Sequence, residues 1–381
     1  MDIETSYPAL SDLRRRARRR IPHFAWEYLD SATGQEQAMQ RNRTALDAVQ
    51  LMPAILKGEM TPDLSTTFLG KTYAAPFGIA PVGMSGMMWP DAERSLARLG
   101  AARSIPYCMS NVATQTPETV QPFLGGQGWF QLYAPRDPDI RRDMLARIKG
   151  AGFHTLVLTV DVPVAARRER QRRGGLRHPP AITPRILAQI ATCPAWALGT
   201  LNHGMPRLRF LESYSDHKGP LPSTAHIGYL MRTSPDWDYL RDLRQDWDGP
   251  LIVKGVLKPK DATRLIAEGV DAIWVSNHAG RQFDAAPAVL DMLPDIRAAV
   301  GPDTPLIYDS SIEGGLDILR AIALGADFVM LGRAFHYGLG AFGERGADHV
   351  VNILMDDMAA NMGQMGITRP PQVRRHLLPM T

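Results

Sequence analysis

The segment AIWVSNHAGRQFD, residues 272–284, joins an apolar run to a group of reactive side chains. Ala272 to Val275 have the apolar, partly β-branched character of a buried strand. Asn277, His278 and Arg281 follow directly, where that strand would end. A single histidine or arginine at such a place more often belongs to a solvated loop. The meaning of this segment therefore depends on whether other strands of the chain end in the same way.

Seven other short apolar segments, each bounded by turn residues, have the same character. In chain order the eight segments are residues 77–83, 105–111, 129–133, 155–161, 250–256, 272–278, 305–311 and 328–333. Helical patterns lie between most of them, at residues 91–102, 137–150, 259–269 and 315–325. Alternation of strands with helices is typical of a parallel sheet, and eight strands predict an α/β fold of the (β/α)8 or TIM barrel type.

The chain is longer than such a barrel requires, with 381 residues against roughly 250 for a minimal barrel. We expect a single domain, residues 1–381, with the barrel core at about residues 76–335. The additions are an N-terminal helical arm, a long insertion after strand four at about residues 174–226, and a C-terminal helical tail at 336–381. The arginine-rich run from Arg14 to Arg20 is interpreted as the solvated face of the first helix.

The composition excludes several classes of protein. The chain is 45% hydrophobic and 22% charged, which is typical of a soluble globular protein. Its formal net charge is only +4, and no long basic stripe with interleaved aromatic residues predicts nucleic-acid binding. Cys108 and Cys193 form neither a disulfide framework nor a metal-binding spacing, so no metal is expected. The N-terminus has no signal-peptide pattern and no apolar run has membrane-spanning length, so the cytoplasm is the expected compartment.

Polar side chains end nearly every predicted strand. In barrels of this kind the reactive groups lie at the carboxyl ends of the strands. The polar residues at these ends are Ser110, Asn111, Gln131, Tyr133, Thr159, Asp161, Lys254, Ser276, Asn277, His278, Asp309 and Arg333. Such groups are costly to bury without partners, and so many at one mouth indicate a functional site rather than a set of unrelated loops.

The residue types indicate acid–base chemistry on an anionic substrate. Asp161 and His278 end strands four and six and are expected to face one another across the mouth. A carboxylate on one ring nitrogen orients the imidazole and makes the other nitrogen a competent base. The guanidinium groups of Arg168 and Arg281 suit a substrate carboxylate. Gly332, which opens the loop after strand eight, lies where such barrels often bind a phosphate.

The residues also resemble a known family, the FMN-dependent L-2-hydroxy acid oxidases and dehydrogenases, which includes glycolate oxidase, lactate oxidase and mandelate dehydrogenase. The similarity runs nearly end to end. It is carried by the motifs IPHFAWEYLDSATGQE, FQLY, LTVDVP, RRE, VKGV, SNHAGRQFD and LGRAFHYGLGAFGERG.

The resemblance implies a role for each residue at the predicted mouth. His278 is the base that takes a substrate proton while an electron pair passes to flavin N5, and Asp161 holds its cation. Arg168 and Arg281 bind the substrate carboxylate, helped by Tyr28, and Tyr133 bonds the substrate hydroxyl. The flavin ring contacts are Ala80, Pro81, Val82, Gly83, Ser110, Gln131, Thr159, Lys254 and Ser276, and the ribityl and phosphate contacts are Asp309, Gly332 and Arg333.

The segment after predicted strand seven departs from the family pattern. Strand seven is usually followed by Asp-Gly-Gly-Ile/Val-Arg-Arg-Gly, whereas here residues 309–315 read DSSIEGG. Glu313 replaces the arginine that helps to hold the FMN phosphate, and a carboxylate ~4 Å from a phosphate dianion would repel it by several kcal/mol. Either Glu313 turns to solvent, another cation compensates, or FMN binds weakly. Gly83 leaves room beside flavin N5 without fixing whether oxygen is the electron acceptor.

The insertion contains apolar residues at helical spacing, including Ile186, Ile190, Trp196 and Leu198. This pattern predicts a helix that either packs over the mouth as a lid or lies at a membrane surface and brings the flavin near a quinone. The second alternative implies a peripheral contact with the inner face of the cytoplasmic membrane. The resemblance further implies a homo-oligomer, often a tetramer.

These observations predict an FMN enzyme that oxidises an L-2-hydroxy acid to the 2-oxo acid and passes electrons to a quinone, a cytochrome or another carrier. One rival is an oxidase that reduces oxygen to hydrogen peroxide. A rival of another class is an FMN-poor, inactive paralogue that serves as a binding protein, which Glu313 motivates.

Overall fold

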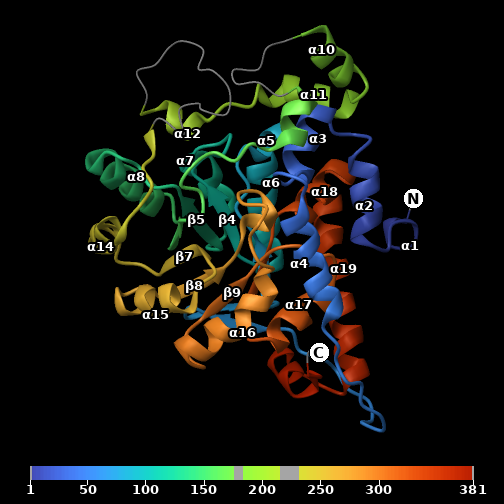
Figure 1. Ribbon diagram of the computed structural model, residues 1–381. Helices are drawn as coiled ribbons and strands as arrows, with labels where there is room; N and C mark the ends of the chain where they lie inside the picture. Colours follow the sequence, from blue (N-terminus) through green and yellow to red (C-terminus); the bar gives the residue numbers. More distant parts are fainter. Residues whose placement is uncertain (1, 176–182, 215–230, 380–381) are drawn as a thin grey trace.

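The computed structural model, described here for residues 2–175, 183–214 and 231–379, contains a closed barrel of eight parallel strands (Figure 1). The strands are β3 (Phe77–Ile79), β4 (Tyr107–Ser110), β5 (Gly128–Leu132), β6 (Thr155–Thr159), β7 (Leu251–Val256), β8 (Ala272–Val275), β9 (Leu306–Tyr308) and β10 (Phe328–Leu331). They neighbour one another in chain order, and β10 closes the ring against β3. The predicted (β/α)8 barrel is confirmed, with all eight strands at the predicted segments.

Strand periodicity sorts the barrel side chains into two layers. Trp129 of β5 points into the barrel, where it joins Trp274 and Phe328 in a buried inner cluster. Its neighbour Phe130 belongs to the outer core and contacts Phe153 edge-on, with ring centroids 5.3 Å apart. Because side chains alternate along a strand, the inward position after Trp129 is Gln131, at the carboxyl end. The same alternation that builds the core therefore aims the last polar residue at the mouth.

A short hairpin covers the opposite end of the barrel. Strands β1 (Thr66–Phe68) and β2 (Lys71–Tyr73) pair antiparallel and insert Phe68 and Tyr73 beneath the inner cluster. The Tyr73 hydroxyl accepts a hydrogen bond of 3.1 Å from Trp129 Nε1. With this end closed by aromatic rings, the carboxyl ends of the strands form the open end.

Helices surround the barrel and form the additions. The helices that follow barrel strands are α5 (Ser85–Met88), α6 (Ala92–Arg103), α7 (Pro117–Val120), α8 (Pro138–Gly150), α14 (Trp237–Asp246), α15 (Pro259–Ala267), α16 (Val289–Val300), α17 (Gly315–Ala323) and α18 (Arg333–Phe342). The arm contains α1 (Ile3–Ser6), α2 (Leu10–Ala17), α3 (His23–Asp30) and α4 (Gln37–Ala48), and the tail contains α19 (Glu344–Met365). Among the residues that the structure describes, 3-10 turns occupy Gln121–Phe123, His278–Gly280 and Pro370–His376.

The arginine run of the arm is not only a solvated face, which corrects that expectation. Helix α2 lies along α18 (Figure 1), and Arg16 and Arg20 donate through Nε to the carbonyls of Ala341 and Gly340, each at 3.0 Å. These carbonyls lie at the carboxyl end of α18, where helical acceptors lack intrahelical donors. Long arginine side chains reach them while their stems cover apolar surface.

The insertion follows β6, the fourth barrel strand, as predicted, but its apolar segment forms two helices. Helix α9 (Glu169–Gly174) leads into it, followed by α10 (Pro184–Ala191), α11 (Pro194–His203) and α12 (Arg209–Glu212). Pro194 lacks an N–H and begins a new helix, so the helical pattern breaks at Cys193. Trp196 is buried and donates from Nε1 to the Met87 carbonyl at 2.9 Å, which fastens α11 to the barrel. Across the described ranges, which omit 176–182 and 215–230, no helix is long and apolar enough to span a bilayer.

Candidate active site

A cavity of about 400 Å³ opens at the carboxyl ends of the strands. Most of the residues predicted for the site line it: Tyr28, Ala80, Pro81, Val82, Gly83, Ser110, Gln131, Tyr133, Thr159, Arg168, Lys254, His278, Arg281, Asp309, Gly332 and Arg333. Asp161 and Ser276 lie behind this wall and bond to His278 and Lys254, which belong to it. The strand ends therefore meet as the sequence predicts.

His278 and Asp161 form a hydrogen-bonded pair at the mouth. His278 Nδ1 lies 2.9 Å from Asp161 Oδ1, and the His278 backbone has the left-handed φ of 57°. Its amide donates to Ser276 Oγ at 3.0 Å, which holds this unusual backbone conformation. Because the carboxylate accepts from Nδ1, the Nε2 nitrogen of a neutral ring carries the lone pair. The pair therefore presents a base to the cavity.

The protonation of this pair follows from its surroundings. Burial lowers the pKa of His278; Asp161 opposes this effect, but Lys254 and Arg168 add to it. Burial alone would raise the pKa of Asp161, but His278 and Lys254 bring it below its ordinary value. At neutral pH the arrangement therefore favours a neutral imidazole next to an ionised carboxylate.

Lys254 places a fixed cation on the cavity wall. Its ammonium donates to Ser276 Oγ at 2.6 Å, pairs with Asp309 Oδ2 at 2.8 Å, and lies 5.0 Å from the Trp274 ring centroid. The lysine comes from β7 and both polar partners follow the neighbouring strands β8 and β9. Because three strands hold it, the ammonium has little freedom to leave the wall.

Two guanidinium groups, those of Arg168 and Arg281, line the cavity and have hydrogen-bond donors that no described residue uses. Arg281 donates through Nη1 to the carbonyls of Leu29 and Ser31 at 3.1 and 3.2 Å, and through Nη2 to Tyr28 at 2.7 Å. Its Nε–H and one Nη2–H remain, which together form a two-donor edge. No described residue accepts a hydrogen bond from the Arg168 guanidinium. Burial, together with the positive charges of Arg168 and Arg333, lowers the pKa of Arg281 to about 9. Because these positive charges lie close together, this part of the cavity favours the binding of an anion.

Gly83 sits at a narrow point of the wall. A β-carbon there would lie 2.7 Å from Val112 Cγ2 and 3.4 Å from the Tyr28 hydroxyl. The closeness of Val112 means that even a methyl group requires a shift of this loop. The glycine thus keeps space beside Tyr28.

Two buried polar atoms on the wall have no partner among the described residues. They are Gln131 Nε2 and Thr159 Oγ1. Ser110 Oγ donates to Gln131 Oε1 at 2.6 Å, which orients the amide and leaves its Nε2 donor available. Buried polar groups are rarely left unpaired, so these atoms indicate a polar ligand in the cavity.

The other end of the cavity is lined by Arg333, Glu313 and Arg43. The Arg333 guanidinium donates to Met39 Sδ at 3.0 Å and to the Ser31 carbonyl at 3.3 Å, and no described carboxylate forms an ion pair with it. Glu313 is exposed, and its amide donates to Asp317 Oδ2 at 2.9 Å. Of the three alternatives that this glutamate raises, a solvent-facing side chain agrees best with its exposure.

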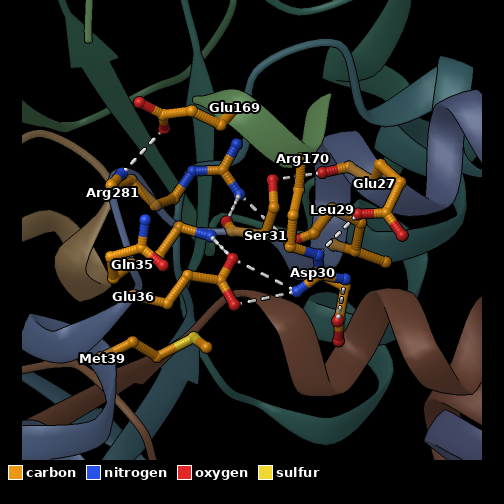
Figure 2. Close-up of polar contacts among 12 residues, drawn as sticks. Glu27, Leu29, Asp30, Ser31, Gln35, Glu36, Met39, Glu169, Arg170 and Arg281 are labelled. Atoms are coloured by element: carbon orange, nitrogen blue, oxygen red, sulfur yellow. Dashed lines mark hydrogen bonds and ion pairs between the residues drawn. The ribbon is translucent and has the colours of Figure 1, made fainter. Parts of the chain in front are cut away.

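Residues of the arm that the barrel pattern did not predict also build the site. Asn42 of α4 exchanges two hydrogen bonds of 2.9 Å with Asn277, directly before the histidine. Arg170 of α9 pairs with Glu27 at 2.7 Å, Asp30 at 3.0 Å and Glu36 at 3.1 Å (Figure 2). Glu27, Asp30 and Glu36 lie inside the family-like motif IPHFAWEYLDSATGQE, and Arg170 directly follows the motif RRE. Asn42 lies outside both motifs, so no sequence signal indicated it.

No group of three or more potential metal ligands occurs within residues 2–175, 183–214 and 231–379.

The chain is similar over nearly its whole length to a known protein family and to several characterised proteins. The family model described as FMN-dependent dehydrogenase matches residues 17–380. An L-lactate dehydrogenase of Pseudomonas syringae pv. syringae (strain B728a) is 37% identical over 372 residues, which cover 97% of both chains. The crystal structure of (S)-mandelate dehydrogenase, a monotopic membrane protein, superposes with a TM-score of 0.90 at 32% identity, covering 97% of this chain and 98% of that one. A mandelate oxidase structure with benzoyl-formic acid gives a TM-score of 0.81 at 29% identity, with 98% of both chains covered.

Proposed function

This chain belongs to the FMN-dependent dehydrogenase family, and on that premise we propose that it oxidises an L-2-hydroxy acid to the corresponding 2-oxo acid. The observation that carries the proposal is the His278–Asp161 pair, 2.9 Å apart, at a cavity that Arg168 and Arg281 also line. A base beside two guanidinium groups suits a substrate that has both an ionised carboxylate and a proton to lose.

The cavity wall fits the cofactor of the family. Gln131 Nε2 and Thr159 Oγ1 are buried polar atoms without partners, and a flavin ring supplies heteroatoms for such groups. Lys254 offers a positive charge on the same wall, and Arg333 offers one at the far end for a phosphate. FMN, when bound, supplies the acceptor for the two electrons that leave the substrate. The ring contacts would be Ala80, Pro81, Val82, Gly83, Ser110, Gln131, Thr159, Lys254 and Ser276, with Asp309, Gly332 and Arg333 toward the phosphate.

His278 would act as the base. Its Nδ1–H donates to Asp161, so Nε2 is the atom that accepts the substrate proton. Once Nε2 is protonated, the ring becomes a cation, and Asp161 stabilises it at 2.9 Å. The lowered pKa of His278 keeps the ring neutral, and hence basic, before the proton arrives.

Arg168 and Arg281 would hold the substrate carboxylate. The free donor edge of Arg281 can make a bidentate contact, while its other donors are fixed by three backbone carbonyls. Tyr28 lies under this guanidinium, with its ring centroid 5.5 Å from Arg281 Cζ, and Tyr133 lines the cavity nearby. A carboxylate fixed in this way would orient the α-carbon and its hydroxyl toward the base.

A substrate screen tests this function. The purified holoenzyme is mixed with an artificial electron acceptor and with L-lactate, glycolate, L-mandelate or longer 2-hydroxy acids. The proposal expects reduction of the acceptor with at least one L-2-hydroxy acid and none with its D enantiomer. Activity with none of these acids would contradict it.

We also propose that the physiological acceptor is a membrane quinone and that the insertion contacts the membrane. Helices α10 and α11 lie at the same end of the molecule as α5 and α7, which follow β3 and β4 (Figure 1). Their surface carries Leu187, Leu198 and Leu201, which are 54%, 63% and 79% exposed, and Met205, which is 51% exposed, follows α11. Exposed apolar side chains gathered beside a site are typical of an interfacial helix pair, and the (S)-mandelate dehydrogenase relative is a monotopic membrane protein.

Vesicle binding and oxygen reactivity test this part separately. The wild-type protein should sediment with anionic phospholipid vesicles, and the combined variant Leu198→Asp and Leu201→Asp should remain in the supernatant. Leu56→Asp is the matched control, because Leu56 is 97% exposed but lies outside the insertion. Equal sedimentation of all three proteins would contradict membrane contact through the insertion. Rapid flavin reoxidation by air after anaerobic reduction would favour the oxidase alternative.

A further inference from the structure

The end of the cavity that is lined by Arg333, Glu313 and Arg43, called the phosphate end below, receives no free cation from the segment after β9. Glu313 is exposed there, and its amide is already committed to Asp317. Arg43 is close, but it is held by Asp317 at 2.6 Å, by Asp47 at 2.7 Å and by the Ser311 carbonyl at 2.8 Å. Two carboxylates therefore neutralise Arg43 before any ligand arrives. If a phosphate binds at this end, its positive partners must come from elsewhere.

The N-terminal arm supplies another guanidinium at this place. Leu13 and Ala17 of α2 are buried, and Arg16 and Arg20 bond to carbonyls at the end of α18. The two helices approach closely at Gly340, where a β-carbon would lie 3.0 Å from Ala17 Cβ. This packing fixes the register of α2 on α18.

The fixed register places the neighbouring face of α2 on the cavity wall. Leu10, Ser11 and Arg14 line the cavity together with Glu313, Arg333 and Tyr337. Tyr337 stands one helical turn after Arg333 on α18, and Arg14 Cζ lies 5.9 Å from its ring centroid. Arg14 is thus near the start of α18, where the amides of the first turn give the helix its positive end.

Asp30 orients Arg14 without using its full capacity. Arg14 Nε and Nη2 both lie 2.8 Å from Asp30 Oδ1, and no described residue accepts from Nη1. The Tyr337 hydroxyl and Arg170 hold the same carboxylate, at 2.8 and 3.0 Å (Figure 2 shows the Arg170 side). Burial alone would lower the pKa of Arg14, but Tyr337, Asp30 and Glu313 hold it above its ordinary value. The guanidinium is therefore charged, oriented and able to donate further hydrogen bonds.

We propose that Arg14 of the N-terminal arm binds the FMN phosphate together with Arg333 and the first turn of α18. The arm then contacts the phosphate through Arg14, at the end of the cavity where Glu313 provides no positive charge. This assignment rests on the proposed function, which requires FMN in the cavity.

Flavin titration of the apoprotein tests the assignment, because riboflavin has the same ring as FMN but no phosphate. Flavin fluorescence is followed as apoprotein is added, for both ligands. Arg14→Ala should weaken FMN binding by about 10- to 100-fold, the range expected for a lost charge-assisted hydrogen bond, and change riboflavin binding by less than about 2-fold. Arg15→Ala is the matched control on the same helix, because Arg15 is 68% exposed and pairs with Asp12. It should leave both affinities unchanged.

Three results would overturn the assignment. They are an unchanged FMN affinity in Arg14→Ala, an equal loss for both flavins, which would mean that Arg14 acts only through Asp30 and α3, and an equal effect of Arg15→Ala. If Arg14→Ala does not fold, Arg14→Lys decides in the same way, because it keeps the charge and loses the planar fork. A wild-type apoprotein that binds neither flavin would overturn the proposed function itself, and the assignment with it.

Discussion

His278 Nδ1 and Asp161 Oδ1 lie 2.9 Å apart, although 117 residues separate them in the chain. The two residues follow β6 and β8, which are separated by only one strand, β7. Lys254 of β7 lies between them in the barrel order and lowers the pKa of both groups. The electrostatics of the pair therefore depend on three successive strand ends, and this leads to predictions about pH.

The pH dependence of kcat/KM should show an acid limb below that of an ordinary histidine. The pKa of His278 is lowered, mainly by burial, from the value of about 6.5 for a free imidazole. The neutral base is then fully present at neutral pH and is lost only as the pH falls through the lowered pKa. We expect a constant kcat/KM from about pH 8 down to about pH 6.5. An acid limb centred above about pH 6.5 would contradict the assignment of His278 as a buried neutral base.

Asp161→Asn should lower kcat and move the acid limb further toward low pH. The Asp161 carboxylate raises the pKa of His278 and so opposes the effect of burial, and its removal should lower that pKa further. Loss of the partner for the imidazolium should reduce kcat by about 100-fold or more. Steady-state kinetics across pH measure both effects, and Asp161→Glu is the control that keeps the charge. A shift of the limb to higher pH would show that the coupling has the opposite sign.

Arg170→Met should raise KM for the 2-hydroxy acid more than it lowers kcat. Arg170 ties Glu27 and Asp30 of α3 to α9, and α3 ends at the carbonyls that hold Arg281. Figure 2 shows the ion pairs of Arg170 beside Arg281. Because α9 begins directly after Arg168, the same ion-pair network positions both guanidinium groups. We expect a KM increase of about 10-fold, because each bidentate carboxylate contact is sensitive to small displacements.

Arg173→Met serves as the matched control for this positioning role, since Arg173 is exposed on the same helix. It should leave KM unchanged, and Arg170→Lys should recover part of the loss. A fall in kcat at constant KM would argue against positioning of the carboxylate-binding arginines.

Glu313→Arg should tighten FMN binding. Removing a negative charge near the phosphate and adding a positive one favours a dianion, although the exposure of Glu313 means that salt screens the effect. The FMN dissociation constant should fall by several-fold at low ionic strength, with a smaller change at high salt. Glu313→Gln separates the loss of repulsion from the gain of attraction. An unchanged dissociation constant in both variants would show that Glu313 points away from the phosphate.

The barrel and most of its mouth could be predicted from the sequence, because apolar strands are recognisable as short runs and the polar residues that follow them lie at the open end of a parallel barrel. A strand such as β8 is apolar on both faces and ends in Ser276 and Asn277, so its carboxyl end is readable without coordinates. The arm follows no such rule. Arg16 and Arg20 carry the same charge as Arg18 and Arg19, and only the packing of α2 on α18 decides which of them bind carbonyls. Likewise, Asn42 could be recognised as a partner of Asn277 only after α4 was placed beside the mouth.

The most direct test of the central claim is anaerobic mixing of the holoenzyme with an L-2-hydroxy acid, compared between the wild-type protein and His278→Ala. The claim predicts that the wild-type flavin loses its yellow absorption within the mixing time, whereas His278→Ala keeps bound, oxidised flavin, since the cavity wall survives and the base does not. Comparable bleaching in the two proteins would show that another group takes the substrate proton.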